Sequence, residues 1–384
     1  MLFWVHLKKT LHNHPRRPAL ILLSLLLVLV PLHAGNIPCK FSTDSKIVAV
    51  ADIHGDYGNF EKILRGTGLI DGNNDWIGGT THLVQLGDIL DRGDNAKEAF
   101  DLLMKLEKQA EAAGGMVHVL IGNHEEANIT GLVFDQSGYL TPWQLWSFLP
   151  DAYREKKKRE LRKKLGYSDG SDGDLEAKLE AEMERFLKKE MGAAQRGVVD
   201  NKTREAYTKN FYEKYGKWLL TKNIVIKIND IVFVHGGLSI EEHYLERDLE
   251  TINSEARREL RIIAEWAADP NRGALSITAE DLKYVMQPPA PHWYRDWARE
   301  PEDGNSATLD QVLAKYKAKH MVIGHTVRVV EYIETRELER FGGRVWAIDV
   351  GISAFFNDLL FALIIEKGEL GSVFIHWWGD DEKK

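Results

Sequence analysis

Five short hydrophobic segments of this chain each lead into a side chain of the kind that binds metal ions. The five polar groups begin at Asp52, Asp88, Asn123, His235 and His325. Short apolar runs bounded by glycine are typical of buried strands, and helical patterns alternate with them along the chain. The alternation predicts an α/β fold in which hydrophobic strands deliver polar ligands at their carboxyl ends.

The expected strands follow from these apolar runs. They cover residues 47–50, 82–86, 116–121, 321–323, 344–350, 359–365 and 372–376, with a hairpin over 224–234 that turns at Asn229 and Asp230. A helix is expected over about residues 96–112, because Ala99, Leu102, Leu103 and Leu106 recur at helical spacing. Together these elements predict one substantial core.

The strand ends offer enough ligands for two divalent cations. In an extended segment residues i and i+2 point the same way, so Asp52 and His54 are able to hold one ion together. Mixed nitrogen and oxygen ligands favour Mn, Fe or Zn over calcium, and we expect manganese. Six ligands exceed the need of one tetrahedral ion. The expected ligands of a two-metal site are Asp52, His54, Asp88, Asn123, His235 and His325.

Most of the remaining histidines lack this setting. We expect structural roles for His82, His118, His243, His292, His320 and His376.

Four motifs carry a resemblance to a known family. They are Asp52-x-His54-Gly55, Gly87-Asp88-x-x-Asp91-Arg92-Gly93, Gly122-Asn123-His124-Glu125 and His235-Gly236-Gly237. Their content and order resemble the metallophosphoesterase (calcineurin-like) superfamily and, within it, the PPP-type protein phosphatases. Residues 75–79, 293–295 and 348–351 are similar to segments of the bacterial Shewanella-like phosphatases. The resemblance covers residues 44–377 and implies a four-layer α/β/β/α sandwich.

The resemblance also implies a role for each polar residue. Asp88 would bridge two ions, the first held by Asp52 and His54 and the second by Asn123, His235 and His325. A hydroxide between the ions would attack phosphorus. Arg92 and Arg295 would bind the phosphoryl oxygens, because a planar guanidinium matches two of them. His124 would protonate the leaving oxygen, oriented by Asp91, and Glu125 would support the site without reacting.

Residues 151–220 interrupt the alternation of strands and helices. They are dense in Lys, Arg and Glu, show helical periodicity, and lie between Asn123 and His235. We interpret this region as part of a helical insertion, over about residues 142–220, in a single domain that spans residues 44–377.

The insertion contains a basic run between residues 156 and 164. We expect a solvated helix face balanced by Glu155 and Glu160, with a polyanion-binding patch as the alternative. The Asp/Gly-rich stretch at residues 168–174 lacks the closing glutamate of a calcium loop and is expected to be a linker.

The N-terminal 34 residues have the composition of a targeting segment. The first 17 contain basic but no acidic residues, residues 19–30 are almost entirely apolar, and Ala34 supplies a small residue for cleavage. This pattern predicts a signal peptide at residues 1–34, with export to the periplasm or the medium. The alternatives are an uncleaved signal anchor, which would attach the chain to a membrane, and a cytosolic apolar helix.

Composition excludes several classes of protein. The chain has 384 residues, of which 44% are hydrophobic, so it is long and apolar enough to fold around a core. With 50 basic and 58 acidic residues its net charge is -8, which argues against general nucleic-acid binding. The single cysteine, Cys39, excludes an internal disulfide and a cysteine-ligated zinc site.

The expected substrate is a phosphorylated protein or peptide, on Ser/Thr, on Tyr or on both. Alternatives are a nucleotide or diadenosine-polyphosphate hydrolase and a broad exported phosphomonoesterase. A phosphate-binding pseudoenzyme with the insertion as its partner surface is a further alternative, which the complete ligand set, Arg92 and His124 argue against. The sequence leaves the oligomeric state open.

Overall fold

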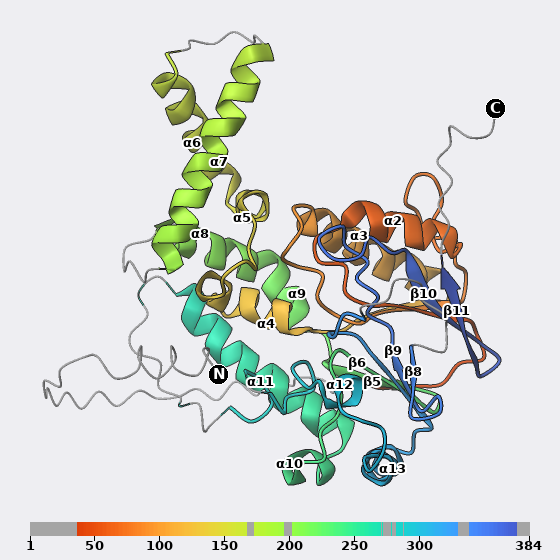
Figure 1. Ribbon diagram of the computed structural model, residues 1–384. Helices are drawn as coiled ribbons and strands as arrows, with labels where there is room; N and C mark the ends of the chain where they lie inside the picture. The colour runs from red at the N-terminus through yellow and green to blue at the C-terminus, as the bar shows by residue number, and fades with distance from the viewer. Residues whose placement is uncertain are drawn as a thin grey trace, which may run out of the picture.

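Two β-sheets lie face to face at the centre of the molecule, with helices on both outer sides (Figure 1). The computed structural model describes residues 37–166, 173–195, 202–269, 271, 278, 282–286, 288–328 and 338–374. The arrangement confirms the predicted α/β/β/α sandwich. Both sheets bury apolar side chains on their two faces, because each lies between the other sheet and a layer of helices.

The first sheet has five strands in the order β11-β10-β2-β3-β4. Its central strands β2 (Ile47–Val50), β3 (His82–Gln85) and β4 (Met116–Val119) run parallel. Strand β10 (Phe361–Glu366) pairs antiparallel with β2 and forms a hairpin with β11 (Glu369–Phe374). The last hairpin strand begins earlier than the sequence predicted.

The second sheet has six strands in the order β1-β5-β6-β7-β9-β8. The predicted hairpin forms from β5 (Val225–Ile228) and β6 (Ile231–Val234), and β7 (His320–Ile323) and β9 (Val345–Ala347) continue the sheet in parallel. Two edge strands, β1 (Lys40–Phe41) and β8 (Glu339–Arg340), are too short to produce a periodic pattern and were not predicted.

The outer layers are helical. Helices α2 (Tyr57–Gly66) and α3 (Ala96–Ala112) cover the first sheet, and α3 has the predicted bounds (Figure 1). On the side of the second sheet lie α10 (Glu242–Leu245), α11 (Leu249–Ala268), α12 (Asp296–Arg299) and α13 (Ser306–Lys315). The long helix α11 was not predicted, although its apolar residues face inward at helical spacing.

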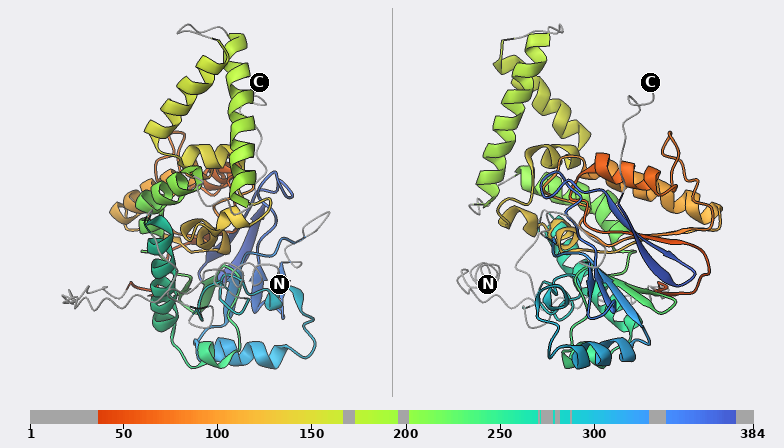
Figure 2. Two further views of the ribbon diagram at one scale, coloured as in Figure 1. Left: turned by 90° about the vertical axis from the view of Figure 1, so that its left-hand side faces the viewer. Right: turned by 45° about the vertical axis from the view of Figure 1, so that its right-hand side comes forward.

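Between Pro142 and Leu219, every regular element that the structure describes is helical. After α4 (Asn123–Ile129) and a 3-10 turn (Leu132–Asp135) come α5 (Pro142–Phe148), α6 (Asp151–Lys164), α7 (Gly173–Gln195), α8 (Lys202–Phe211), a π-helical turn (Tyr212–Gly216) and α9 (Lys217–Leu219). Helices α6 and α7 form an arm that projects from the body (Figure 2).

Aromatic packing joins α5, α8 and the π-helical turn to α3. Phe100 of α3 contacts Phe148, Phe211 and Tyr215 of the helical segment, with ring centroids 5.4–6.4 Å apart. On α6 the basic side chains find acidic partners, as in the pairs Lys157–Glu160, Lys158–Glu155, Arg162–Glu176 and Lys164–Glu182. These pairs support the solvated-face interpretation.

Within the described residues, no helix is both long and apolar enough to cross a lipid bilayer. The predicted signal segment at residues 1–34 lies outside the described residues.

Candidate active site

The predicted metal ligands come together where the parallel strands of both sheets end. Asp52 and His54 follow β2, Asp88 follows β3 and Asn123 opens α4 after β4, while His235 follows β6 and His325 follows β7. All six side chains are buried. They meet because the carboxyl ends of parallel strands share one edge of a sheet, and the two sheets present these edges to each other.

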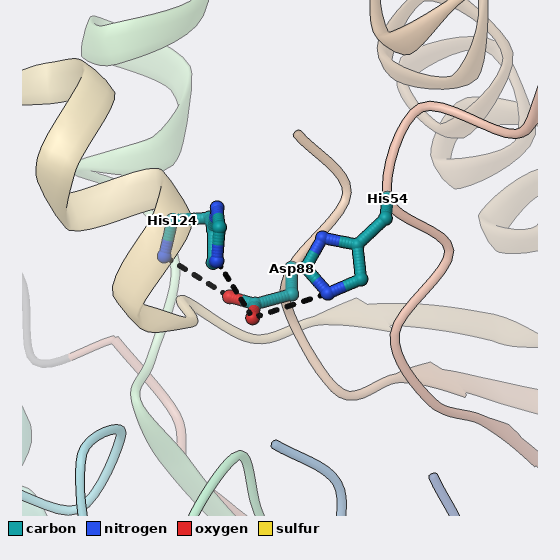
Figure 3. Close-up of side chains that lie close together, drawn as sticks. All are labelled: His54, Asp88 and His124. Atoms are coloured by element: carbon teal, nitrogen blue, oxygen red, sulfur yellow. Dashed lines mark hydrogen bonds and ion pairs between the residues drawn. The ribbon is translucent and has the colours of Figure 1, made fainter. Parts of the chain in front are cut away.

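The ligand atoms form two groups that share Asp88. The first contains His54, Asp88 and His124 (Figure 3), and the Nε2 atoms of both histidines lie 3.8 Å from Asp88 Oδ2. The second contains Asp88, His235 and His325, with His235 Nε2 lying 3.3 Å from Asp88 Oδ1 and 3.1 Å from His325 Nδ1. Asp88 is thus placed to bridge two sites.

Two further predicted ligands border these groups. Asn123 Oδ1 lies 3.2 Å from His235 Nε2, which adds an oxygen to the second group. Asp52 Oδ2 lies 3.9 Å from His54 Nε2, and both of its oxygens accept the His325 backbone N–H at 3.1 Å. The compact first group therefore contains His124, the predicted proton donor, where the sequence pattern suggested Asp52.

The donor atoms are arranged as a cation would require. His54 Nδ1 donates to Leu90 O at 3.1 Å and His235 Nδ1 donates to Leu86 O at 3.0 Å, which fixes both rings with an unshared pair on Nε2. For His235 this pair faces oxygens and the ring nitrogen of His325. Electron-rich atoms at such separations repel one another unless a positive ion lies between them, so this donor set fits divalent cations.

The site backbone is unusual. Five non-glycine residues of the predicted motifs have positive φ, namely His54 (42°), Asp88 (53°), Asp91 (69°), Arg92 (71°) and His325 (66°). Left-handed backbone is costly for such residues and concentrates at functional sites, where the surrounding fold enforces it.

Glycine is required at position 122, because a Cβ there would lie 2.2 Å from Asp88 Oδ1.

Burial and neighbouring charges shift the pKa values of the two central carboxylates, Asp52 and Asp88, in opposite directions. Burial, together with Asp349 and Asp88, raises the pKa of Asp52 well above its usual range. Burial acts on Asp88 in the same direction, but His235 and His124 outweigh it and hold the pKa of Asp88 well below its usual range. Asp88 is therefore the stable anion at the centre of the site.

A hydrogen-bonded pair lies beside the two groups. His124 Nδ1 donates to Asp91 Oδ2 at 2.7 Å, which leaves Nε2 directed to the Asp88 side. Burial opposes a charge on His124, but Asp88 and Asp91 raise its pKa above the usual range. The ring of Tyr139 stacks on His124, with centroids 4.0 Å apart. This arrangement suits a proton donor.

The two predicted phosphate-binding arginines approach from different elements. Arg92 donates through one terminal nitrogen to Gly138 O, while its buried Nε has no partner within the described residues. Its guanidinium lies between the rings of Tyr139 and Phe355, 4.7 and 5.2 Å from their centroids. Arg295 donates to His325 O at 2.6 Å, which places it against the second group.

Glu125 connects two backbone segments next to the ligands. Its carboxylate accepts the backbone N–H groups of Asp88 at 2.7 Å, Ile89 at 2.8 Å and Gly122 at 2.8 Å. Burial and the nearby Asp88 raise the pKa of Glu125 to about 7. It joins the loop after β3 to the start of α4.

Several residues at the site were missed by sequence reasoning. They are Asn128 and Gln144, which bond to Asp91; Tyr139 and Phe355, which flank Arg92; and the buried Asp349, whose burial raises its pKa to about 7. Gln144 belongs to the segment interpreted as an insertion, and no local spacing relates it to Asp91. Asp349 follows β9 in the same way that the predicted ligands follow their strands, and this signal was available.

Comparisons with known proteins find protein phosphatases that are similar to this chain. The chain is 27% identical to Shewanella-like protein phosphatase 1 of Plasmodium berghei, covering 82% of this chain and 69% of that protein. It is 29% identical to Shewanella-like protein phosphatase 2 of Arabidopsis thaliana, covering 75% and 68%. The solved structure of a cold-active protein-tyrosine phosphatase of a psychrophilic Shewanella species matches with a TM-score of 0.57 and 25% identity, covering 88% and 82%.

The family comparison covers the strands and motifs that build the site. The model of the calcineurin-like phosphoesterase family matches residues 45–329. The predicted resemblance is thereby confirmed: this chain belongs to the calcineurin-like phosphoesterase family.

Proposed function

We propose that this chain is a phosphoprotein phosphatase that hydrolyses phosphomonoesters with two divalent metal ions. The observation that carries the proposal is Asp88, shared by two groups of buried ligands and adjacent to the His124–Asp91 pair. The Shewanella-like relatives and the tyrosine phosphatase structure support phosphorylated proteins as the substrate class.

The ligands would be those that the sequence predicts. Asp52 and His54 would serve one ion and Asn123, His235 and His325 the other, with Asp88 between them. When bound, two such ions supply a nucleophilic oxygen at neutral pH and neutralise charge on the phosphoryl group. Manganese is our proposal for the metal, with iron or zinc as alternatives.

The side chains of this protein supply binding and proton transfer. Arg92 would bind a phosphoryl oxygen through its guanidinium, and Arg295 would do the same from its position next to His325. His124 donates a proton from Nε2 to the leaving oxygen, since Asp91 holds Nδ1–H and fixes the ring.

Aromatic side chains at the arginine favour phosphotyrosine over phosphoserine. Tyr139 and Phe355 flank Arg92, and Phe355 is 57% exposed although it is large and apolar. An aryl ring attached to a phosphate bound at Arg92 would find a partner in the exposed Phe355 ring. A serine side chain would leave that ring in water.

The test is hydrolysis by the full chain with added Mn²⁺. The substrates are a phosphotyrosine peptide, a phosphoserine peptide, an aryl phosphate monoester, its diester and diadenosine tetraphosphate. We expect phosphate release from the monoesters, with the phosphotyrosine peptide preferred and little release from the diester or the dinucleotide. Metal analysis of the purified protein tests the proposed manganese.

Two controls separate the metal site from the substrate assignment. Chelation and Asp88→Asn should each abolish release, because Asp88 belongs to both ligand groups. A clear preference for the dinucleotide or the diester, lost in both controls, would retain the two-metal site and exclude the phosphoprotein assignment.

We further propose export of the chain, with residues 1–34 as a cleaved signal or an uncleaved membrane anchor. The support is the basic start, the apolar stretch at residues 19–30 and the small Ala34. Cell fractionation followed by N-terminal sequencing tests it. A new N-terminus after Ala34 in the exported fraction supports cleavage, and intact protein in the cytosol excludes export.

A further inference from the structure

Glu126 is a buried carboxylate for which the proposed mechanism has no use. It lies on α4, the helix that begins with Asn123 and carries His124, and it is 1% exposed. A carboxylate is rarely buried unless polar groups compensate for its lost hydration. Its hydrogen-bond partners therefore indicate why the helix carries it.

Those partners come from one distant stretch of the chain. Glu126 Oε1 accepts the indole N–H of Trp293 at 3.0 Å. Glu126 Oε2 accepts the backbone N–H of Met286 at 3.0 Å and also pairs with Nε2 of His292, which is fully buried. One side chain of α4 therefore contacts Met286 and, in the segment 288–293, both His292 and Trp293.

The same segment is fixed to the second metal-ligand group. The carbonyl oxygen of Pro291 accepts the backbone N–H groups of Gly236 and Gly237 at 2.9 Å, immediately after His235. A side chain at Gly236 would lie 2.9 Å from that oxygen, so glycine permits the close approach. The segment is thus attached to α4 on one side and to the end of β6 on the other.

This segment leads directly to Arg295. The Trp293 ring meets His325 edge-on, with centroids 6.2 Å apart. Arg295 donates to His325 O at 2.6 Å and to Thr326 Oγ1 at 3.2 Å. The guanidinium therefore sits at the second ligand group, and its residue lies two positions after Trp293, which donates to Glu126.

We propose that Glu126 is a positioning residue that fixes Trp293 and Arg295 at the metal-ligand groups and so sets the affinity of the site for the phosphoryl group. The helix that supplies Asn123 and His124 would then also hold Arg295 in place. This proposal rests on the proposed phosphatase function, in which Arg295 binds phosphoryl oxygens.

The first variant is Glu126→Gln in the full chain. A Gln side chain has one acceptor oxygen, and its NH₂ group would face an N–H donor of the segment, so Arg295 loses its fixed position. We expect KM for an aryl phosphate monoester and the Ki of inorganic phosphate to rise about tenfold, with kcat changed much less. Metal content should be unchanged.

A matched control comes from Glu259 on α11. It is also 1% exposed and accepts the backbone N–H groups of Lys283 at 3.2 Å and Tyr284 at 2.9 Å, in the same part of the chain but before the contacts to Glu126. Glu259→Gln should lower thermal stability by a similar amount and leave KM unchanged. Equal KM effects of both variants would overturn the proposal.

A double-mutant cycle isolates the link to Arg295. In an Arg295→Met background, Glu126→Gln should raise KM by less than about twofold, because the group that it positions is gone. If the two effects instead multiply in full, Glu126 acts independently of Arg295 and the proposal is wrong.

Trp293→Phe is a milder second variant for the case in which Glu126→Gln does not fold. It removes one N–H donor to Glu126 and keeps an aromatic ring near His325. KM should rise severalfold, and an unchanged KM would overturn the proposal.

If the unsubstituted chain hydrolyses no monoester, the proposed function fails, and calorimetric titration with inorganic phosphate still tests the positioning role.

Discussion

Asp91 and Gln144 exchange two hydrogen bonds. The Asp91 backbone N–H donates to Gln144 Oε1 at 2.7 Å, and Gln144 Nε2 donates to Asp91 Oδ1 at 2.7 Å. Asp91 in turn holds the ring of His124, so α5 contacts this histidine through one intermediate residue. The helical segment after residue 142 thereby helps to fix the positions of Asp91 and His124.

Replacing this glutamine should slow the reaction. In Gln144→Leu the Asp91 carboxylate loses a buried donor, so the orientation of His124 loosens and kcat should fall about tenfold. The control is Gln109→Leu, because Gln109 makes the same kind of two-way contact, with Asp75 and Trp76, away from the site. Steady-state kinetics and metal analysis of both variants provide the measurement. Similar kcat losses in both would contradict the prediction.

His124 should matter most for poor leaving groups. His124→Asn removes the proposed proton donor, and kcat for a phosphopeptide should fall about 10²-fold or more. Aryl phosphates whose leaving phenol is strongly acidic need less protonation, so their loss should be smaller. Rates measured across a series of phenols check this. An equal loss for every phenol would argue against proton donation by His124.

Phe355 should affect the choice of phosphorylated side chain. Phe355→Ala removes the exposed ring beside Arg92, and kcat/KM for a phosphotyrosine peptide should fall roughly fivefold, while that for a phosphoserine peptide stays unchanged. Ile77→Ala is the control, because Ile77 is 58% exposed, similar to Phe355. Equal losses of kcat/KM for both peptides would contradict a role of Phe355 in substrate specificity.

Stability should fall in mild acid because of a histidine pair outside the site. His118 is buried beside His82, with His118 Nε2 3.0 Å from His82 Nδ1, and burial lowers the pKa of His118 to about 3. Between this value and the ordinary 6.5 the unfolded chain binds more protons than the folded one. The contribution to unfolding free energy is therefore full above pH 6.5 and shrinks by about 2 kcal/mol near pH 5.

Urea unfolding at pH 7 and pH 5 measures this effect. His118→Leu should reduce the difference between the two pH values. If the unfolding free energy of His118→Leu differs between pH 7 and pH 5 as much as that of the unsubstituted protein, another group is responsible.

The local pattern of this sequence determined the strands and the ligands that follow them. Apolar runs such as residues 47–50 and 321–323 specify buried strands, and parallel strands place the residues after their carboxyl ends at a common edge. For that reason Asp52, Asp88 and His325 were identified before their distances were known. The same periodicity predicted a helix at about residues 96–112, where α3 lies.

Tertiary structure alone decided which distant residues serve those ligands. Gln144 reaches Asp91 and Phe355 reaches Arg92 because of how helices and loops pack, and packing leaves no periodic trace in the sequence. Likewise, the local sequence does not distinguish Glu126 from other glutamates, because its contact with Trp293 exists only in the folded protein. The local sequence determines where each strand lies and which polar residue follows it. Contacts between remote segments form only when the whole core is buried.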